Sequence, residues 1–142
     1  MTDCIFCKII AGEIPSVKVY EDEDVLAFLD ISQATPGHTL LVTKKHVPDI
    51  FAYSPELAAT VFARLPKLAN AIKASDPKIT GMNILNNNGE VAYQSVFHSH
   101  IHLIPRYDSD DGFSIHFGDH SAQYDTPQLQ AIAKRISAEV HD

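Results

Sequence analysis

Three histidines alternate along one apolar segment, and this pattern constrains the chain more than any other. His98, His100 and His102 occupy every second position within residues 95–104, a run followed by Pro105. Side chains alternate between the two faces of a β-strand, so a strand here would direct all three imidazoles to one side. Neighbouring rings would lie roughly 6.6 Å apart and the outer two roughly 13 Å apart. A single metal ion cannot bind both outer rings, so the three histidines need at least two roles.

An imidazole in such a row can bind a metal, transfer a proton or act as a nucleophile. In phosphate chemistry, one ring can attack phosphorus while a neighbour donates a hydrogen bond to a phosphoryl oxygen. The alternative is a set of three solvent-facing histidines on a sheet surface. β-Branched and aromatic residues suit a strand better than histidine does, so we favour a functional row.

The rest of the chain predicts an α+β fold with an antiparallel sheet of about five strands and two main helices. The other strands are expected at residues 16–21, 25–30, 38–43 and 81–86, and the first two form a hairpin. A helix over 54–74 begins at Ser54-Pro55 and should kink near Phe62, because Pro66 lies inside it. The segment 107–124 is expected to be irregular, and a second helix opens at Thr126. All 142 residues then form a single domain, 1–142.

Charge and hydropathy exclude several classes of protein. The formal net charge of -7 argues against a nucleic-acid polymer as partner, because phosphate neutralisation needs a broad basic surface. A local set of donors can still hold a small anionic ligand. We find no apolar run near the ~18 residues that span a bilayer and no secretory signal. We therefore expect a cytoplasmic protein without a membrane partner.

Cys4 and Cys7 form a C-x-x-C pair, and they are the only cysteines in the sequence. A thioredoxin-like redox role would place this motif after a strand of a βαβ unit, which the first residues do not supply. A zinc site needs two more ligands, for which His46 and His98 are the candidates. Two reduced cysteines that only pack are the third possibility.

The chain resembles the histidine triad (HIT) superfamily. Residues 94–104 look like its His-x-His-x-His signature followed by apolar residues, and residues 4–47 are similar to the bacterial HIT proteins of the Hint branch. The resemblance implies the α+β HIT fold, a homodimer and the binding of a purine nucleotide or nucleotide conjugate. It also implies hydrolysis or nucleotidyl transfer at an α-phosphorus. The predicted helix 54–74 and strand 81–86 are candidate dimer-interface elements.

The resemblance also implies catalytic and metal-binding roles for particular residues. His100 would be the nucleophile, and His102 would contact the phosphate and assist the leaving group. His98 would support the site, and His38 would orient or polarise the triad. One structural zinc ion per chain would be bound by the metal set, which is Cys4, Cys7, His46 and His98.

A further set of residues is implied to bind the substrate. Asp30 and Ile31 match positions that hold the ribose and nucleoside, although a strand-end turn residue is the simpler interpretation of Asp30. The apolar walls of the base pocket correspond to Ile5, Phe6, Ile9 and Phe28, of which Phe6 and Phe28 could equally be plain core. The phosphate side corresponds to Asn86, Gln94, Ser95 and Val96; residues 86–89 also suit a simple turn.

The sequence departs from the family pattern at three positions. Tyr93 stands where the family usually has glycine before the glutamine, and Ser99 replaces an apolar residue between the first two triad histidines. Thr43 stands where Hint relatives have proline before Lys-Lys-His. Because glycine allows close backbone approach to a phosphate, Tyr93 bears on the shape of the phosphate loop.

We expect an enzyme that acts on nucleoside phosphoramidates or dinucleoside polyphosphates through a nucleotidyl-histidine intermediate. The alternative is a non-catalytic nucleotide-binding adaptor or sensor. An intact middle histidine favours the enzyme, because a binding protein needs no nucleophile. A metallohydrolase requires a carboxylate or third ligand beside an open metal position. It ranks third because the sequence has no H-E-x-x-H pattern.

Overall fold

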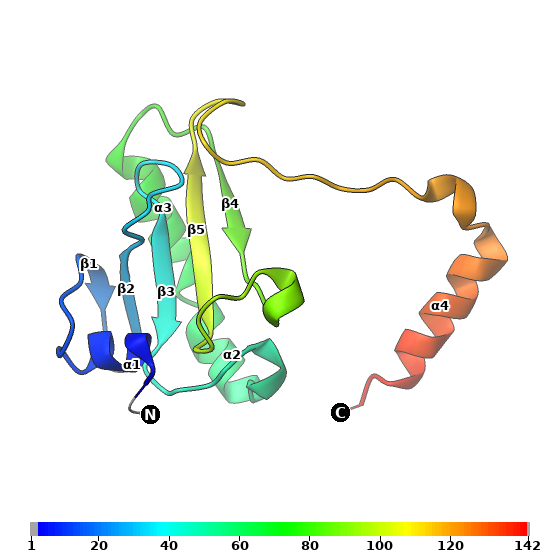
Figure 1. Ribbon diagram of the computed structural model, residues 1–142, viewed down its shortest axis with the longest axis horizontal. Helices are drawn as coiled ribbons and strands as arrows, with labels where there is room; N and C mark the ends of the chain where they lie inside the picture. Colours follow the sequence, from blue (N-terminus) through cyan, green and yellow to red (C-terminus); the bar gives the residue numbers. More distant parts are fainter. Residues whose placement is uncertain (1–2, 142) are drawn as a thin grey trace.

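One antiparallel sheet organises the computed structural model, which describes residues 3–141 (Figure 1). Within that range the sheet has five strands in the order β1-β2-β3-β5-β4. Their bounds are Lys18–Glu21 for β1, Val25–Leu29 for β2, Thr39–Thr43 for β3, Gly81–Leu85 for β4 and His100–Arg106 for β5. Every pair of neighbouring strands is antiparallel, which confirms the predicted α+β class and the β1–β2 hairpin.

The strands β2 and β3 are buried on both faces of the sheet, and alternate residues of each strand point to the two sides. Val25, Ala27 and Leu41 belong to a core that includes Val61, Leu68 and Ile72 of the long helices. The residues between them on the strands, Leu26, Phe28, Leu40 and Val42, form a second core with Phe6 and Ile9 of the first helix. In the register of β3 against β5, Val42 faces His100 and Leu40 faces His102. These two histidines therefore lie on the side of the first helix.

The first helix is short, and the predicted long helix is two helices. Helix α1 covers Ile5–Ile10, and the Cys4 side chain accepts a hydrogen bond from the Cys7 backbone N–H at its start. Instead of one kinked helix over 54–74, α2 spans Pro55–Phe62 and α3 spans Leu65–Ser75. Pro66 lies in the first turn of α3, where its missing N–H removes no helical hydrogen bond.

The histidine strand differs from its prediction at both ends. β5 begins only at His100, so His98 lies before the strand and does not share its alternation. The Ser99 backbone N–H instead donates to Val47 O at 2.7 Å, which keeps this stretch out of the ladder. The strand also continues through Pro105 to Arg106. Pro105 is tolerated because β3 no longer pairs there, and Pro105 O accepts from the Thr35 hydroxyl instead.

The C-terminal arm, residues 107–141, leaves the body of the molecule (Figure 1). It begins at an ion pair in which Arg106 Nη2 lies 2.9 Å from Asp111 Oδ1, and it ends in helix α4, Thr126–Ala138. Asp125 and Gln128 cap α4 reciprocally, as in a capping box. Residues 114–141 are all exposed except the half-buried Ile132. Among the described residues, none of the helices has the length and apolar character needed to cross a bilayer.

Candidate active site and metal centre

A cavity of about 500 Å³ opens beside α1 on the face that carries His100 and His102. Its walls come from α1, the α1–β1 connection, the end of β2, the segment before β5 and β5 itself. The lining residues are Ile5, Phe6, Ile9, Pro15, Ser16, Val17, Phe28, Leu29, Asp30, Ile31, Leu40, Ser95, Val96, His100 and His102. The lining is mostly apolar with a few convergent polar groups, the usual composition of a small-molecule site.

His100 presents an unprotonated nitrogen to this cavity. Its Nδ1 lies 2.8 Å from the carbonyl oxygen of His98, and because a carbonyl can only accept, Nδ1 carries the proton. The lone pair of the neutral ring is therefore on Nε2. Burial lowers the pKa of His100 below its usual 6.5, so the ring is neutral at pH 7. The edge of Phe6 packs against the ring at 5.0 Å between centroids.

His102 has the opposite tautomer, because its Nδ1 accepts a hydrogen bond from His38. The Ala34 backbone N–H donates to His38 Nδ1 at 3.1 Å, which leaves the His38 proton on Nε2. That nitrogen lies 2.9 Å from His102 Nδ1 and donates to it. His102 therefore carries its own proton on Nε2. Burial lowers the pKa of His102 to about 4, which keeps this donor neutral at pH 7.

Asp30 stands beside this histidine pair as a carboxylate. One oxygen accepts from the Ser32 backbone N–H at 2.8 Å and from the Ser32 hydroxyl, and the other lies 3.8 Å from His38 Nε2. Although burial opposes ionisation, the Ser32 hydrogen bonds lower the pKa of Asp30 overall. Asp30, His38 and His102 are close enough to hold a metal. Binding a metal through His38 Nε2 would break the His38–His102 hydrogen bond and move the His38 proton to Nδ1, where it would oppose the Ala34 N–H. The geometry therefore favours proton donation over metal binding.

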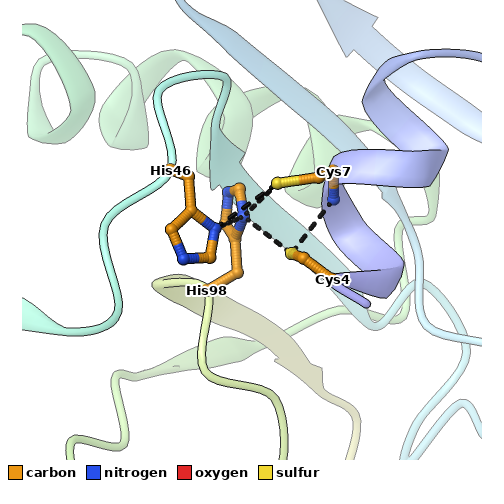
Figure 2. Close-up of side chains that lie close together, drawn as sticks. All are labelled: Cys4, Cys7, His46 and His98. Atoms are coloured by element: carbon orange, nitrogen blue, oxygen red, sulfur yellow. Dashed lines mark hydrogen bonds between the residues drawn. The ribbon is translucent and has the colours of Figure 1, made fainter. Parts of the chain in front are cut away.

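Cys4, Cys7, His46 and His98 form a second cluster, shown in Figure 2. Their ligand atoms lie within 4.8 Å of one another. Cys4 Sγ is 3.3 Å from His98 Nδ1, Cys7 Sγ is 3.4 Å from His46 Nδ1, and the two Nδ1 atoms are 3.1 Å apart. Ligands at the zinc bond lengths of a tetrahedral site would be separated by roughly 3.3–3.8 Å. The cluster can therefore bind a metal ion with little rearrangement.

The surroundings prepare His98 as a ligand. Its Nε2–H donates to Thr43 O at 2.7 Å, which leaves the Nδ1 lone pair directed at the two sulfurs. Burial, together with the neighbouring Cys4, raises the pKa of the Cys7 thiol to about 11 in the absence of metal. A bound cation would displace that thiol proton. His98 thus faces the cysteines, away from the cavity lined by His100 and His102.

The expected substrate-binding residues divide into two groups. Ile5, Phe6, Ile9, Phe28, Asp30, Ile31, Ser95 and Val96 line the cavity. Asn86 and Gln94 are not among the residues that line it. Gln94 donates to Pro48 O and Val96 O and accepts from the Gly89 N–H, while Asn86 donates to His100 O. Both amides therefore hold loops together around the segment that carries Ser95 and Val96.

Two departures from the family pattern have structural explanations. Tyr93 adopts a left-handed conformation with φ of 69°, a region that favours glycine, while its side chain projects into solvent. A glycine would adopt this backbone conformation more readily than tyrosine does. Ser99 is buried, and its hydroxyl lies 2.9 Å from the Tyr53 hydroxyl. This hydrogen bond satisfies the one polar side chain on an otherwise apolar face of the segment.

Sequence reasoning missed several contributors to the site. Pro15, Ser16, Val17, Leu29 and Leu40 also line the cavity. The sequence could have indicated these residues as part of the cavity wall, because they flank or belong to predicted strands beside Phe28. The Ala34 N–H carries no side-chain signal, and only the folded loop directs it at His38.

An α+β fold whose antiparallel sheet sets the last two histidines of a His-x-His-x-His run against an apolar cavity is typical of a histidine triad protein. The family model for the HIT domain matches residues 11–109. The chain is also 54% identical over 140 residues to Protein hit of Bacillus subtilis, covering 96% of each. The chain therefore belongs to the HIT family.

Solved structures agree over the full length of the chain. A HIT family protein from Bacillus anthracis has a TM-score of 0.93 at 56% identity, covering 98% of both chains. A HIT family member from Bacillus subtilis has a TM-score of 0.94 at 51% identity, covering 99% of both. A zinc-bound histidine triad family protein from Mycobacterium smegmatis has a TM-score of 0.74 at 37% identity, covering 97% of this chain and 99% of that one.

Two further relatives have names that state an activity. The adenosine 5'-monophosphoramidase hnt1 of Schizosaccharomyces pombe is 36% identical over 137 residues, covering 96% of this chain and 98% of the relative. The adenylylsulfatase HINT3 of Arabidopsis thaliana is 43% identical over 111 residues, covering 76% of this chain and 54% of the relative. The relatives of this chain thus include a nucleotide phosphoramidase and an adenylylsulfatase.

Proposed function

We propose that this protein hydrolyses or transfers a nucleotidyl group at the α-phosphorus of nucleoside phosphoramidates or dinucleoside polyphosphates. The observation that carries the proposal is the pair of complementary tautomers in one cavity. His100 offers a lone pair on Nε2, and His102 offers a proton on Nε2. The ring centroids are 5.2 Å apart, so both can reach one phosphoryl group. The names of the two hydrolase relatives support the same class of substrate.

The reaction proceeds in two displacements. His100 Nε2 attacks the α-phosphorus, a P–N bond to the ring forms, and the bond to the leaving group breaks with its electron pair going to that group. The leaving atom takes one proton from His102 Nε2. Water then attacks the nucleotidyl-histidine, the P–Nε2 bond breaks, and one proton of the water returns to His102 Nε2. The hydrogen bond from His38 to His102 Nδ1 keeps Nε2 as the nitrogen that exchanges this proton with the substrate.

The nucleoside occupies the apolar part of the cavity. Phe6 and Phe28, whose rings meet edge to face at 5.6 Å, offer surfaces for a purine base. The Asp30 carboxylate can accept hydrogen bonds from two ribose hydroxyls. Ile5, Ile9 and Ile31 complete the apolar wall, and Ser95 and Val96 border the phosphate.

Mass spectrometry of trapped protein tests the proposal. The protein incubated with adenosine 5'-phosphoramidate and quenched in mild base should gain one adenylyl group, and the adduct should be absent from His100→Ala. Undiminished turnover by His100→Ala would overturn the mechanism. Nucleotide binding without any turnover by the wild type would support the adaptor function instead.

We infer that Cys4, Cys7, His46 and His98 hold one structural zinc ion. Two thiolates and two imidazoles are a donor set that zinc prefers, and the bound ion would cross-link α1 to the segment before β5. The zinc-bound relative supports this assignment. Metal analysis should find about one zinc per chain, lost in a Cys4→Ser/Cys7→Ser variant together with thermal stability. A metal-free wild type of equal stability would contradict it.

We further propose that two copies of the chain associate into a homodimer. The proposed small-molecule partner is a purine nucleotide or nucleotide conjugate. The uncovered apolar residues of α4 support association, among them Leu129 and Ile136. The predicted interface elements, which are now α2, α3 and β4, remain candidates, and β4 is an edge strand with Ile84 half exposed.

A further inference from the structure

The peptide group that joins His98 to Ser99 holds His100 in the tautomer that the proposed attack requires. Its carbonyl oxygen accepts the His100 Nδ1 proton at 2.8 Å, and its N–H donates to Val47 O at 2.7 Å. If this peptide plane rotated, the carbonyl would leave Nδ1, and the His100 proton could move to Nε2. The cavity would then face an N–H in place of a lone pair. The orientation of one peptide plane therefore decides whether His100 can attack.

The sheet does not fix this plane, because the ladder between β3 and β5 ends at the pair of Val42 and His100. The connection between β3 and α2 holds the plane instead. This connection provides the Val47 carbonyl and also Tyr53, whose hydroxyl lies 2.9 Å from the Ser99 hydroxyl. Ser99 is 2% exposed, and among the described residues this is the one hydrogen bond that either hydroxyl makes. Ser99 is thus attached to the connection through both its backbone and its side chain.

Tyr53 is a fixed point for this attachment. Its ring packs against the core on the side of the long helices and meets the Phe62 ring of α2 at 62°, with 6.1 Å between the centroids. Its hydroxyl reaches Ser99 on a face that continues with the apolar Ile101 and Leu103. Two apolar side chains of the same shape could fill this space at little cost in stability, but a hydrogen bond also imposes a direction. The buried pair is therefore better suited to orienting the segment than to stabilising the fold.

We propose that Tyr53 and Ser99 are positioning residues for the nucleophile. Their hydrogen bond holds the peptide plane between His98 and Ser99 and so keeps the lone pair of His100 on Nε2. The inference rests on the proposed function, because its consequence is for the attack by His100. Neither Tyr53 nor Ser99 lines the cavity, so we expect no contact of either with the nucleotide.

Three variants separate positioning from stability. Tyr53→Phe and Ser99→Ala each leave one hydroxyl without its partner and should lower the melting temperature, whereas Tyr53→Phe/Ser99→Ala removes both hydroxyls and should recover most of it. In all three variants, kcat for adenosine 5'-phosphoramidate should fall about tenfold while KM stays within about twofold, because the cavity walls are unchanged. Tyr20→Phe is the matched control. It removes a hydrogen-bonded hydroxyl from another ring on the same core and should leave kcat unchanged.

Long-range ¹H–¹⁵N spectra of the histidine rings provide a readout separate from activity. His100 of the wild type should be a single tautomer with its proton on Nδ1, and the double variant should contain both tautomers. Recovery of kcat together with the melting temperature in the double variant would reduce the pair to a structural role and overturn the proposal. Unchanged kcat in Tyr53→Phe, or an unchanged His100 tautomer in the double variant, would overturn it as well.

The spectra also distinguish failure of this inference from failure of the proposed function. A wild type that turns over no nucleotide substrate, while the double variant still changes the His100 tautomer, would contradict the proposed function and support the positioning of His100.

Discussion

Neighbouring histidines of one short segment differ in chemistry because backbone groups hold their protons in different places. The Thr43 carbonyl fixes the proton of His98 on Nε2, and the His98 carbonyl fixes that of His100 on Nδ1. The Ala34 N–H fixes the tautomer of His38 and, through it, that of His102. Burial lowers the pKa of each triad ring, so these neutral tautomers persist at pH 7. One residue type can thereby supply the proposed metal ligand, the proposed nucleophile and the proposed proton donor.

Burial of His102 makes stability depend on pH. The pKa of His102 is about 4 in the folded protein against 6.5 for the ordinary ring. Between these values the unfolded chain binds the proton and the folded chain does not, so stability falls as the pH drops from about 6.5 to about 4. We expect the free energy of unfolding of His102→Asn, which keeps an acceptor near His38, to fall less than that of the wild type between pH 7 and pH 4.5. After allowance for the partial exposure of the ring, the difference should be about 1–2 kcal/mol.

Urea unfolding of both proteins at a series of pH values measures this difference. Release of the proposed zinc ion at acid pH would weaken both proteins alike, so only the difference between the curves reports on His102. Parallel curves for wild type and His102→Asn would show that burial of the ring does not set the pH dependence.

At the scale of elements, the start of the C-terminal arm supports the loop of residues 30–38. Gly112 has φ of 108°, and a Cβ there would lie 2.5 Å from Ala34 O. The Ala34 N–H also donates to His38 and so fixes the tautomers of His38 and His102. A shift of this loop would therefore change the position of the His102 proton. Gly112→Ala should destabilise the protein by about 2 kcal/mol or more, since it adds both a forbidden conformation and a backbone clash. It should lower kcat as well.

Thermal unfolding and steady-state kinetics together check this prediction. Gly118→Ala is the matched control, because its Cβ would meet only the end of the His120 side chain, at 3.2 Å. Equal stability of the two variants would mean that the arm can move away from the loop without lowering the stability of the folded protein.

Alternation and turn signals predicted every strand of the sheet, but not where β5 begins. The Ser99–Val47 hydrogen bond that removes His98 from the strand joins residues far apart in sequence, and no local pattern encodes it. The four metal-binding candidates could be predicted from the sequence, because cysteine and histidine side chains themselves indicate a metal site. The His38–His102 hydrogen bond could not be predicted. It depends on a folded loop in which the Gln33 side chain bridges the backbone of Asp30 and His38.

At the scale of the whole molecule, the chain divides into a body with two cores and an arm without one. Figure 1 shows α4 apart from the sheet, and Leu129, Ile136 and Val140 are exposed along it. Yet the solved Bacillus structures match this chain over 98–99% of its length at TM-scores of 0.93 and 0.94. Such agreement requires the arm to follow a similar path in those proteins. We propose that a second copy of the chain holds the arm on this path, because a two-fold dimer would bury the exposed apolar residues of both copies of α4.

Charge placed on the apolar face of α4 tests whether the arm joins two copies. We expect the wild type to have the mass of a dimer by light scattering after gel filtration. Leu129→Glu/Ile136→Glu should shift it to a monomer, because two carboxylates cannot be buried without partners. Ala131→Glu/Ala138→Glu adds the same charge on the opposite side of the helix, where both side chains are exposed, and should remain dimeric. A monomeric wild type, or a dimer that survives the first pair of substitutions, would show that α4 does not form the contact.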